Sequence, residues 1–84
     1  MALLFDPDAY DAYSRVPLTV AQWVDKVFDW LQEEPISAQA RRHHFTTGEW
    51  AVTAHLQSED WLIIWEPDGL DVRVRYLGEN TPGI

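Results

Sequence analysis

The chain has 84 residues, which is enough for one domain with one hydrophobic core. Fourteen Asp and Glu against six Lys and Arg give a formal net charge of −8, so the field of the whole molecule repels phosphate and disfavours nucleic acid unless the few cations cluster. The absence of cysteine excludes disulfides and metal binding through sulfur. No stretch approaches the roughly 20 apolar residues of a membrane span, and the N-terminus does not resemble a signal peptide, so we expect a cytoplasmic protein.

The first predicted helix is marked by Asp6 and Pro7. Asp is a common N-cap, and Pro is tolerated at the first helical position because its missing N–H would be unpaired there. These residues predict a helix over residues 7–15, which Pro17 stops. Residues 2–5 are apolar and too few to decide whether they form an edge strand before this helix.

A second helix is predicted over residues 20–34. Thr19 and Gln22 fit a capping box, and Leu18 and Trp23 occupy the two hydrophobic-staple positions around it. Apolar residues then recur at intervals of three and four, which predicts one buried face, with Trp30 at its margin. The residues of this stripe are Val20, Trp23, Val24, Val27, Phe28 and Leu31.

Ser37 is a candidate cap for a short third helix that would run to about His44. Arg41 and Arg42 would lie near its C-terminal end, where cations complement the helix dipole. The consecutive residues Arg41, Arg42, His43 and His44 are also the candidate RNA-binding or anion-binding patch of the chain. Adjacent His residues do not share a helical face, so we expect no metal site here and no cofactor.

Three strands are predicted after Gly48. Residues 50–56 alternate between apolar and polar positions, which is typical of a half-buried strand, and residues 57–60 form a turn. Residues 61–65 (WLIIW) are apolar at every position and predict a central strand that is covered on both faces. Residues 66–69 (EPDG) predict the next turn.

In the last strand, simple alternation places Val72, Val74 and Tyr76 on one face and Asp71, Arg73 and Arg75 on the other. We expect the second helix to cover the side with Trp61, Ile63 and Trp65, and the stems of Arg73 and Arg75 to cover Leu62 and Ile64.

The predicted fold class is α+β, as a single domain over residues 1–84. Its helical part spans about residues 6–44 and contains two or three helices. These pack on an antiparallel meander over about residues 49–77, three-stranded, or four-stranded if residues 2–5 join it. Residues 79–84 are expected to be a flexible tail.

This order of elements resembles the RelE/ParE superfamily of toxins from bacterial toxin–antitoxin pairs. The similarity is strongest from about residue 20 to residue 78 and rests on four segments after the amphipathic helix. These segments are residues 41–45 (RRHHF), 48–52 (GEWAV), 60–65 (DWLIIW) and 72–78 (VRVRYLG). None of the four is a specific motif by itself.

The resemblance implies a site on the sheet. In the ribonuclease branch of the superfamily, basic residues hold the scissile phosphate of ribosome-bound messenger RNA, and Tyr, His or Glu assists proton transfer. By position, Arg73, Arg75, Tyr76 and His55 are the candidate catalytic residues. Because side chains alternate between the two faces of a strand, Tyr76 would lie on the opposite face from the two arginines unless the strand contains a bulge.

Simpler interpretations exist for the same residues. Arg73 and Arg75 would pair with cross-strand acids such as Glu49 and Asp71 on a solvated face, and Arg41 and Arg42 would only complement a helix end.

Two functions are therefore carried forward. The first is a RelE/ParE-like toxin that acts on translation by messenger RNA cleavage, or on another cellular target, with an antitoxin as protein partner and RNA or the ribosome as substrate. The alternative is an acidic, non-enzymatic binding module of the inhibitor or immunity type that docks on a basic protein surface. Neither needs a membrane or a small-molecule cofactor, and whether the chain is an enzyme stays open.

Overall fold

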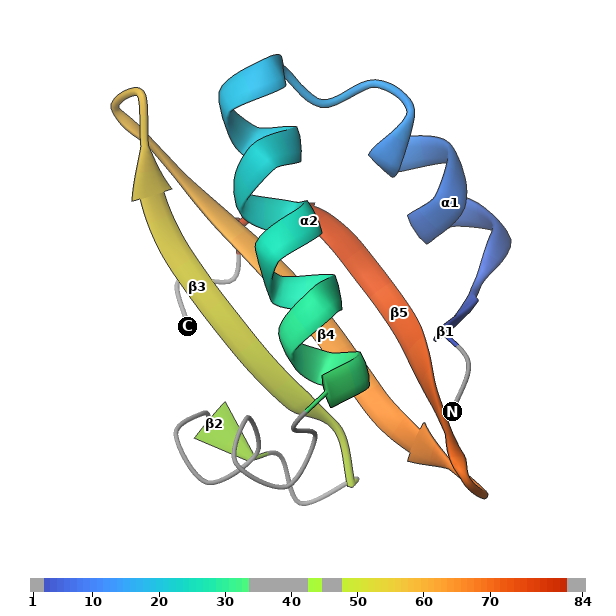
Figure 1. Cartoon of the computed structure of the whole chain (residues 1–84). Helices are drawn as coiled ribbons and strands as arrows, with labels where there is room; N and C mark the ends of the chain where they lie inside the picture. The colour runs from blue at the N-terminus through green and yellow to red at the C-terminus, as the bar shows by residue number, and fades with distance from the viewer. Residues whose placement is uncertain (1–2, 34–42, 45–47, 82–84) are drawn as a thin grey trace.

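The chain folds into two helices packed on a mixed β-sheet (Figure 1). The structure is a computed structural model that describes residues 3–33, 43–44 and 48–81. The elements in chain order are β1 (Leu3–Phe5), α1 (Pro7–Tyr13), α2 (Leu18–Glu33), β2 (His43–His44), β3 (Trp50–Leu56), β4 (Glu59–Asp68) and β5 (Asp71–Glu79). The strands lie in the order β1-β5-β4-β3-β2. The predicted α+β class is confirmed.

Strands β3, β4 and β5 form the predicted antiparallel meander, and both edges of the sheet gain a short strand. On one edge, β1 pairs with β5, which answers the question left open for residues 2–5. The pairing is parallel, with Leu3 opposite Val72 and Phe5 opposite Val74, so the sheet is mixed. On the other edge, β2 pairs antiparallel with β3. The prediction of a helix reaching His44 was therefore wrong at His43–His44, and residues 37–42 of that predicted helix lie outside the described residues.

The two hairpins turn within two residues each. Gln57 and Ser58 both have positive φ, at 51° and 67°, as a type I′ turn requires. Between β4 and β5 the turn is Gly69-Leu70, with φ of 63° at Gly69. The predicted turn at residues 57–60 therefore included two residues of β4, and the one at residues 66–69 included three.

Strand β4 continues through Pro67, inside the segment predicted to be a turn. The pairing of β3 with β4 ends at Trp50 and Trp65, so Pro67 has no neighbour in β3 that needs its missing N–H, and it pairs only with Val72. At the other end, β5 runs through Glu79, and the Asn80 N–H donates to the Asp60 carbonyl at 2.8 Å. The predicted flexible tail therefore begins at least two residues too early.

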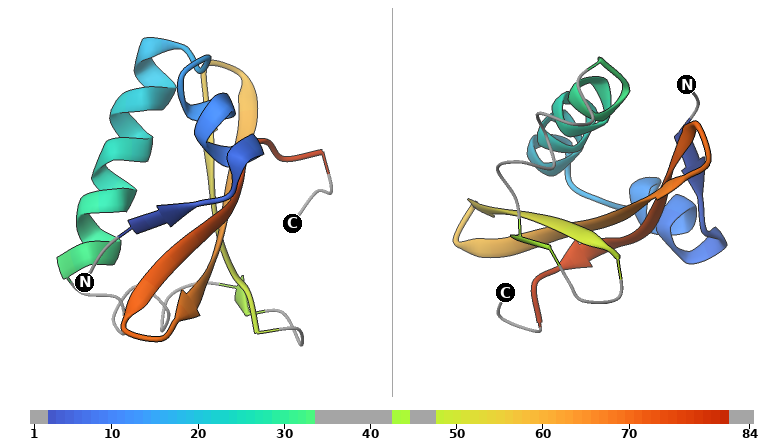
Figure 2. Two further views of the ribbon diagram at one scale, coloured as in Figure 1. Left: turned by 90° about the vertical axis from the view of Figure 1, so that its right-hand side faces the viewer. Right: turned by 90° about the horizontal axis from the view of Figure 1, so that it is seen from below.

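Helix α2 lies on one face of the sheet, as both views of Figure 2 show, and the core side chains fill the space between them. The predicted stripe on α2 is confirmed, with Trp23 and Trp30 partly buried at its sides. The central strand contributes Trp61, Ile63 and Trp65 to this core, as expected. The buried residues from α2 and the sheet are Val20, Val24, Val27, Phe28, Leu31, Val52, Trp61, Ile63, Trp65, Val72, Val74 and Leu77.

The opposite side of the sheet, here called the outer face, faces away from α2. Leu62 on this face is nevertheless fully buried, and Ile64 is half-buried. Their neighbours in β5 are Gly78 and Tyr76. The expected cover by the stems of Arg73 and Arg75 was wrong for Leu62, which lies opposite a glycine over which the Tyr76 ring folds.

The capping predictions need correction at both helices. The helix α1 ends at Tyr13, two residues before the predicted end. Asp6 has N-cap geometry, but its side chain makes no capping hydrogen bond. Thr19 is the second residue of α2, which begins at Leu18, and its hydroxyl oxygen accepts a hydrogen bond from the Gln57 amide at 2.9 Å.

One side-chain hydrogen bond joins the two helices. The Tyr13 hydroxyl donates to the Asp25 carboxylate. This hydrogen bond, followed by burial and the negative charge of Asp25, raises the pKa of Tyr13 above its ordinary value near 10. Because the folded state holds the phenol proton more tightly than the unfolded state, the stabilisation is complete below about pH 10 and is lost as the pH rises through the folded pKa.

We therefore expect Tyr13→Phe to lower the free energy of unfolding by about 1 kcal/mol near pH 8, since the bond is half-exposed and involves one charged group. The difference between the two proteins should shrink as the pH rises above 10, because the native chain alone then loses the bond. Urea denaturation at several pH values measures it. A difference that stays constant from pH 8 to pH 10.5 would contradict the role of this bond.

Candidate functional site

A β-bulge brings three of the predicted site residues onto the outer face. In the ladder between β4 and β5, Ile64 pairs with Tyr76, but the next residue, Trp65, pairs with Val74. Arg75 is therefore the extra residue, and both Arg75 and Tyr76 lie on the outer face with Arg73. The predicted alternation was wrong beyond Val74, because Leu77, and not Tyr76, is the next residue buried against α2.

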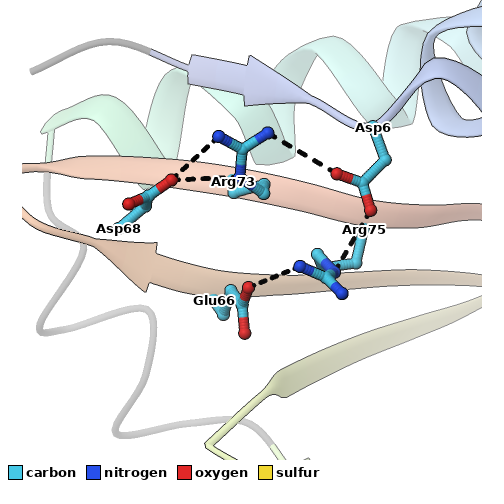
Figure 3. Close-up of polar contacts among 5 residues, drawn as sticks. All are labelled: Asp6, Glu66, Asp68, Arg73 and Arg75. Atoms are coloured by element: carbon cyan, nitrogen blue, oxygen red, sulfur yellow. Dashed lines mark hydrogen bonds and ion pairs between the residues drawn. The ribbon is translucent and has the colours of Figure 1, made fainter.

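The two arginines are held by three carboxylates (Figure 3). Arg73 binds one oxygen of Asp68 through Nε at 3.0 Å and Nη2 at 2.9 Å. Arg75 donates from Nη1 to Glu66 at 2.8 Å. Asp6 bridges both arginines, at 3.5 Å from Arg73 Nη1 and 3.2 Å from Arg75 Nε. We call these five residues the arginine cluster; its formal charge is −1.

The cluster ties three segments of the chain together. Glu66 and Asp68 come from the end of β4, the arginines from β5, and Asp6 from the link between β1 and α1. The Asp6 N–H also donates to the Val74 carbonyl at 3.0 Å, which fixes the backbone beside the arginines. The Asp6 carboxylate therefore pairs with β5 instead of capping α1.

The carboxylates around Arg73 favour its charged form. The hydrogen bond that Arg73 donates to Asp68 is the main cause that raises the pKa of the Arg73 guanidinium, and the charges of Asp68 and Asp6 act in the same direction while desolvation opposes them. The side chains are only half-buried, with 31% of Arg73 and 43% of Arg75 exposed. An incoming phosphate would reach these guanidinium groups by displacing a carboxylate.

Tyr76 lies next to the cluster, at the position opposite Ile64. Its ring folds over Gly78, where an added Cβ would lie 2.9 Å from the hydroxyl oxygen, so only glycine leaves room for it. The hydroxyl donates to the Glu79 carbonyl at 2.8 Å, and 37% of the residue is exposed. The phenol therefore lies on the outer face over Gly78, with its hydroxyl directed along β5 toward Glu79.

His55 is not brought to the same place. It lies opposite Asp60, whose carboxylate is 2.7 Å from His55 Nδ1, at the start of β4. Arg73 lies opposite Glu66, six positions further along β4. At about 3.3 Å per residue this separates His55 from Arg73 by roughly 20 Å, too far to act on one phosphate group.

The predicted basic patch is also remote from the cluster. His43 and His44 form β2, which is three strand positions from β5, a separation of roughly 14 Å. Arg41 and Arg42 lie outside the described residues. No group of three or more His, Asp or Glu side chains able to hold a metal occurs in the described ranges 3–33, 43–44 and 48–81. No helix within those ranges is long and apolar enough to span a bilayer.

The arginines pair with Asp6, Glu66 and Asp68, whereas the sequence had suggested cross-strand acids such as Glu49 and Asp71. Glu66 and Asp68 could have been found by placing the turn at Gly69 and Leu70, because that register sets Glu66 opposite Arg73. Asp6 had no local signal, since its position depends on the parallel pairing of β1 with β5.

Comparison with solved structures identifies the fold. The chain is similar to a chain in the crystal structure of the intact Escherichia coli RelBE toxin–antitoxin complex, with a TM-score of 0.68, 20% sequence identity, and coverage of 94% of this chain and 95% of that chain. It is also similar to the isolated E. coli RelE toxin, with a TM-score of 0.66, 20% identity, and coverage of 92% and 81%. No family model and no curated protein matches the chain. The chain therefore has a RelE-like fold.

Because Asp6 holds both arginines, we expect Asp6→Asn to destabilise the protein more than Asp29→Asn, which removes the same charge from the exposed side of α2. The urea midpoint of each variant against the native chain measures this. The additional loss of stability in Asp6→Asn, relative to Asp29→Asn, should be smaller in 1 M salt, where the Debye length is about 3 Å. Equal midpoints for the two variants would show that the bridge contributes nothing to stability.

Proposed function

We propose that this chain is a RelE-like toxin of a toxin–antitoxin pair that acts on messenger RNA during translation. The observation that carries the proposal is the bulge in β5, which gathers Arg73, Arg75 and Tyr76 on one face of a RelE-like fold. The matched chain in the RelBE complex supports a protein antitoxin as partner for this chain as well.

The arrangement suits cleavage by the neighbouring 2′-hydroxyl. In that reaction the 2′-oxygen bonds to phosphorus, the bond to the 5′-oxygen breaks, and negative charge grows on the phosphoryl oxygens. Two guanidinium groups would stabilise this charge once the phosphate has displaced a carboxylate. A base must take the 2′-hydroxyl proton, and an acid must protonate the leaving 5′-oxygen.

Glu66 and Tyr76 are our candidates for the base and the acid. In the register of β4 and β5, Arg75 lies between Glu66 and Tyr76. The Glu66 carboxylate is 2.8 Å from Arg75 Nη1. Glu66 would accept the proton of the 2′-hydroxyl, and the Tyr76 phenol would give its proton to the 5′-oxygen after leaving the Glu79 carbonyl. His55 and the segment 41–44 have no part in this proposal.

The acidic binding module remains the second candidate, because three carboxylates already neutralise the two arginines and the chain carries a net charge of −8. Such a protein would dock on a basic partner surface without cutting RNA. The two functions differ in whether the arginines are needed.

Expression in bacteria separates them. We expect the native chain to arrest growth and to produce cut messenger RNA in a cell-free translation reaction. The double variant Arg73→Ala/Arg75→Ala should lose both effects, while Arg15→Ala, whose side chain is 75% exposed and bonds only Asp11 in the described structure, should keep them. Circular dichroism of the purified variants controls for folding.

Absence of both growth arrest and RNA cleavage from the folded native chain would remove the toxin proposal and favour the binding module. Arrest that persists in the double variant would place the toxic activity elsewhere on the molecule.

A further inference from the structure

A second surface lies at the end of the sheet opposite the Gly69-Leu70 turn. Helix α1 packs against β5 (Figure 1), and a hollow of about 440 Å³ opens between α1 and the ends of β4 and β5. Asp8, Asp11 and Glu79 supply carboxylates to its lining. Arg15, the cation in the lining, already forms an ion pair with Asp11 at 2.8 Å.

A neighbouring hollow of about 390 Å³ continues this surface. It shares Glu79 with the first hollow and adds the carboxylates of Glu59 and Asp60, with no basic residue in its lining. We call the two hollows together the acidic groove. Five carboxylates and one guanidinium group line it. The groove therefore creates a strong local negative potential that attracts cations.

Apolar side chains distinguish the groove from an ordinary acidic surface. Val16 and Pro17 line the first hollow, together with the indole of Trp61. Trp61 is 8% exposed, and its buried Nε1 has no hydrogen-bond partner among the described residues. Because this Nε1 is sealed from solvent, a ligand in the hollow would meet the carbon atoms of the Trp61 ring and not its N–H.

We propose that the acidic groove docks a basic segment of a partner protein. Lysine and arginine side chains match it in two ways, because their charged ends would meet the carboxylates while their aliphatic stems pack on Val16, Pro17 and the Trp61 ring. Two hollows that share Glu79 in their linings fit an extended chain with several cations better than a single small amine. The inference goes beyond the proposed function, since it concerns another surface and holds whether or not the outer face binds RNA.

Titration of the full ¹⁵N-labelled chain with a hexalysine peptide tests the proposal. We expect the peptide to shift the Trp61 indole signal, assigned with Trp61→Phe, and the backbone amides of Asp8 and Glu79. Hexaglutamate should shift none of them. Spermidine separates a peptide site from a polyamine site and should bind at least about fivefold more weakly than hexalysine, because it lacks a peptide backbone and has fewer charges.

Two variants that each lose two negative charges test whether hexalysine binds at the acidic groove. Asp8→Asn/Glu79→Gln removes two groove carboxylates and should weaken hexalysine binding by about fivefold or more, whereas Asp29→Asn/Glu33→Gln removes two carboxylates from the exposed side of α2 and should change it by less than about twofold. Equal weakening in both variants, shifts confined to other regions, no binding, or spermidine binding as tight as that of hexalysine would each overturn the proposal. None of these outcomes depends on toxicity.

Discussion

One extra residue in β5 determines how this protein divides its side chains between core and surface. Opposite the Ile64–Trp65 step of β4, the strand inserts Arg75, so that Arg73, Arg75 and Tyr76 share the outer face while Leu77 turns inward. Without the bulge, regular alternation would direct the Tyr76 ring toward α2 and Leu77 toward solvent. The core is therefore closed by a leucine, and the outer face receives two cations and a phenol.

The arginine cluster shows how the fold stabilises these cations in an acidic chain. Asp6 leaves the N-terminus of α1 without a side-chain cap and instead bridges Arg73 and Arg75, which also fastens β1 and α1 to the sheet. Because carboxylates already occupy guanidinium N–H groups, fewer of these groups remain to bind a phosphate. If the outer face binds RNA, the substrate has to compete with Asp6, Glu66 and Asp68, and such binding should weaken strongly with salt.

The sequence predicted the elements whose cause is local. The stripe of α2 and the uniformly apolar strand at residues 61–65 carry strong periodicity, and both form as expected. Features with a distant cause were missed. The parallel pairing of β1 joins Leu3 to Val72 across most of the chain, and the bulge has no glycine to mark it.

The same difference between local and distant causes explains why only part of the candidate site was predicted. Arg73, Arg75 and Tyr76 were found from their position in the last strand, but their common face depends on the bulge. His55 lies on β3, which β4 separates from β5, and at the opposite end of the sheet from the arginines, which only the register reveals. Asp6 looked like a helix cap because capping is a local rule, and its pairing with β5 is not local.

The account rests on the side of the sheet to which the Tyr76 ring points, and a nuclear Overhauser spectrum of the folded chain measures this directly. We predict cross-peaks from the Tyr76 ring protons to the Hα protons of Gly78 and none to the valine methyl groups of α2. Cross-peaks between the Tyr76 ring and the methyl groups of Val24 or Val27 would contradict the bulge and, with it, the placement of both arginines on the same face as the phenol.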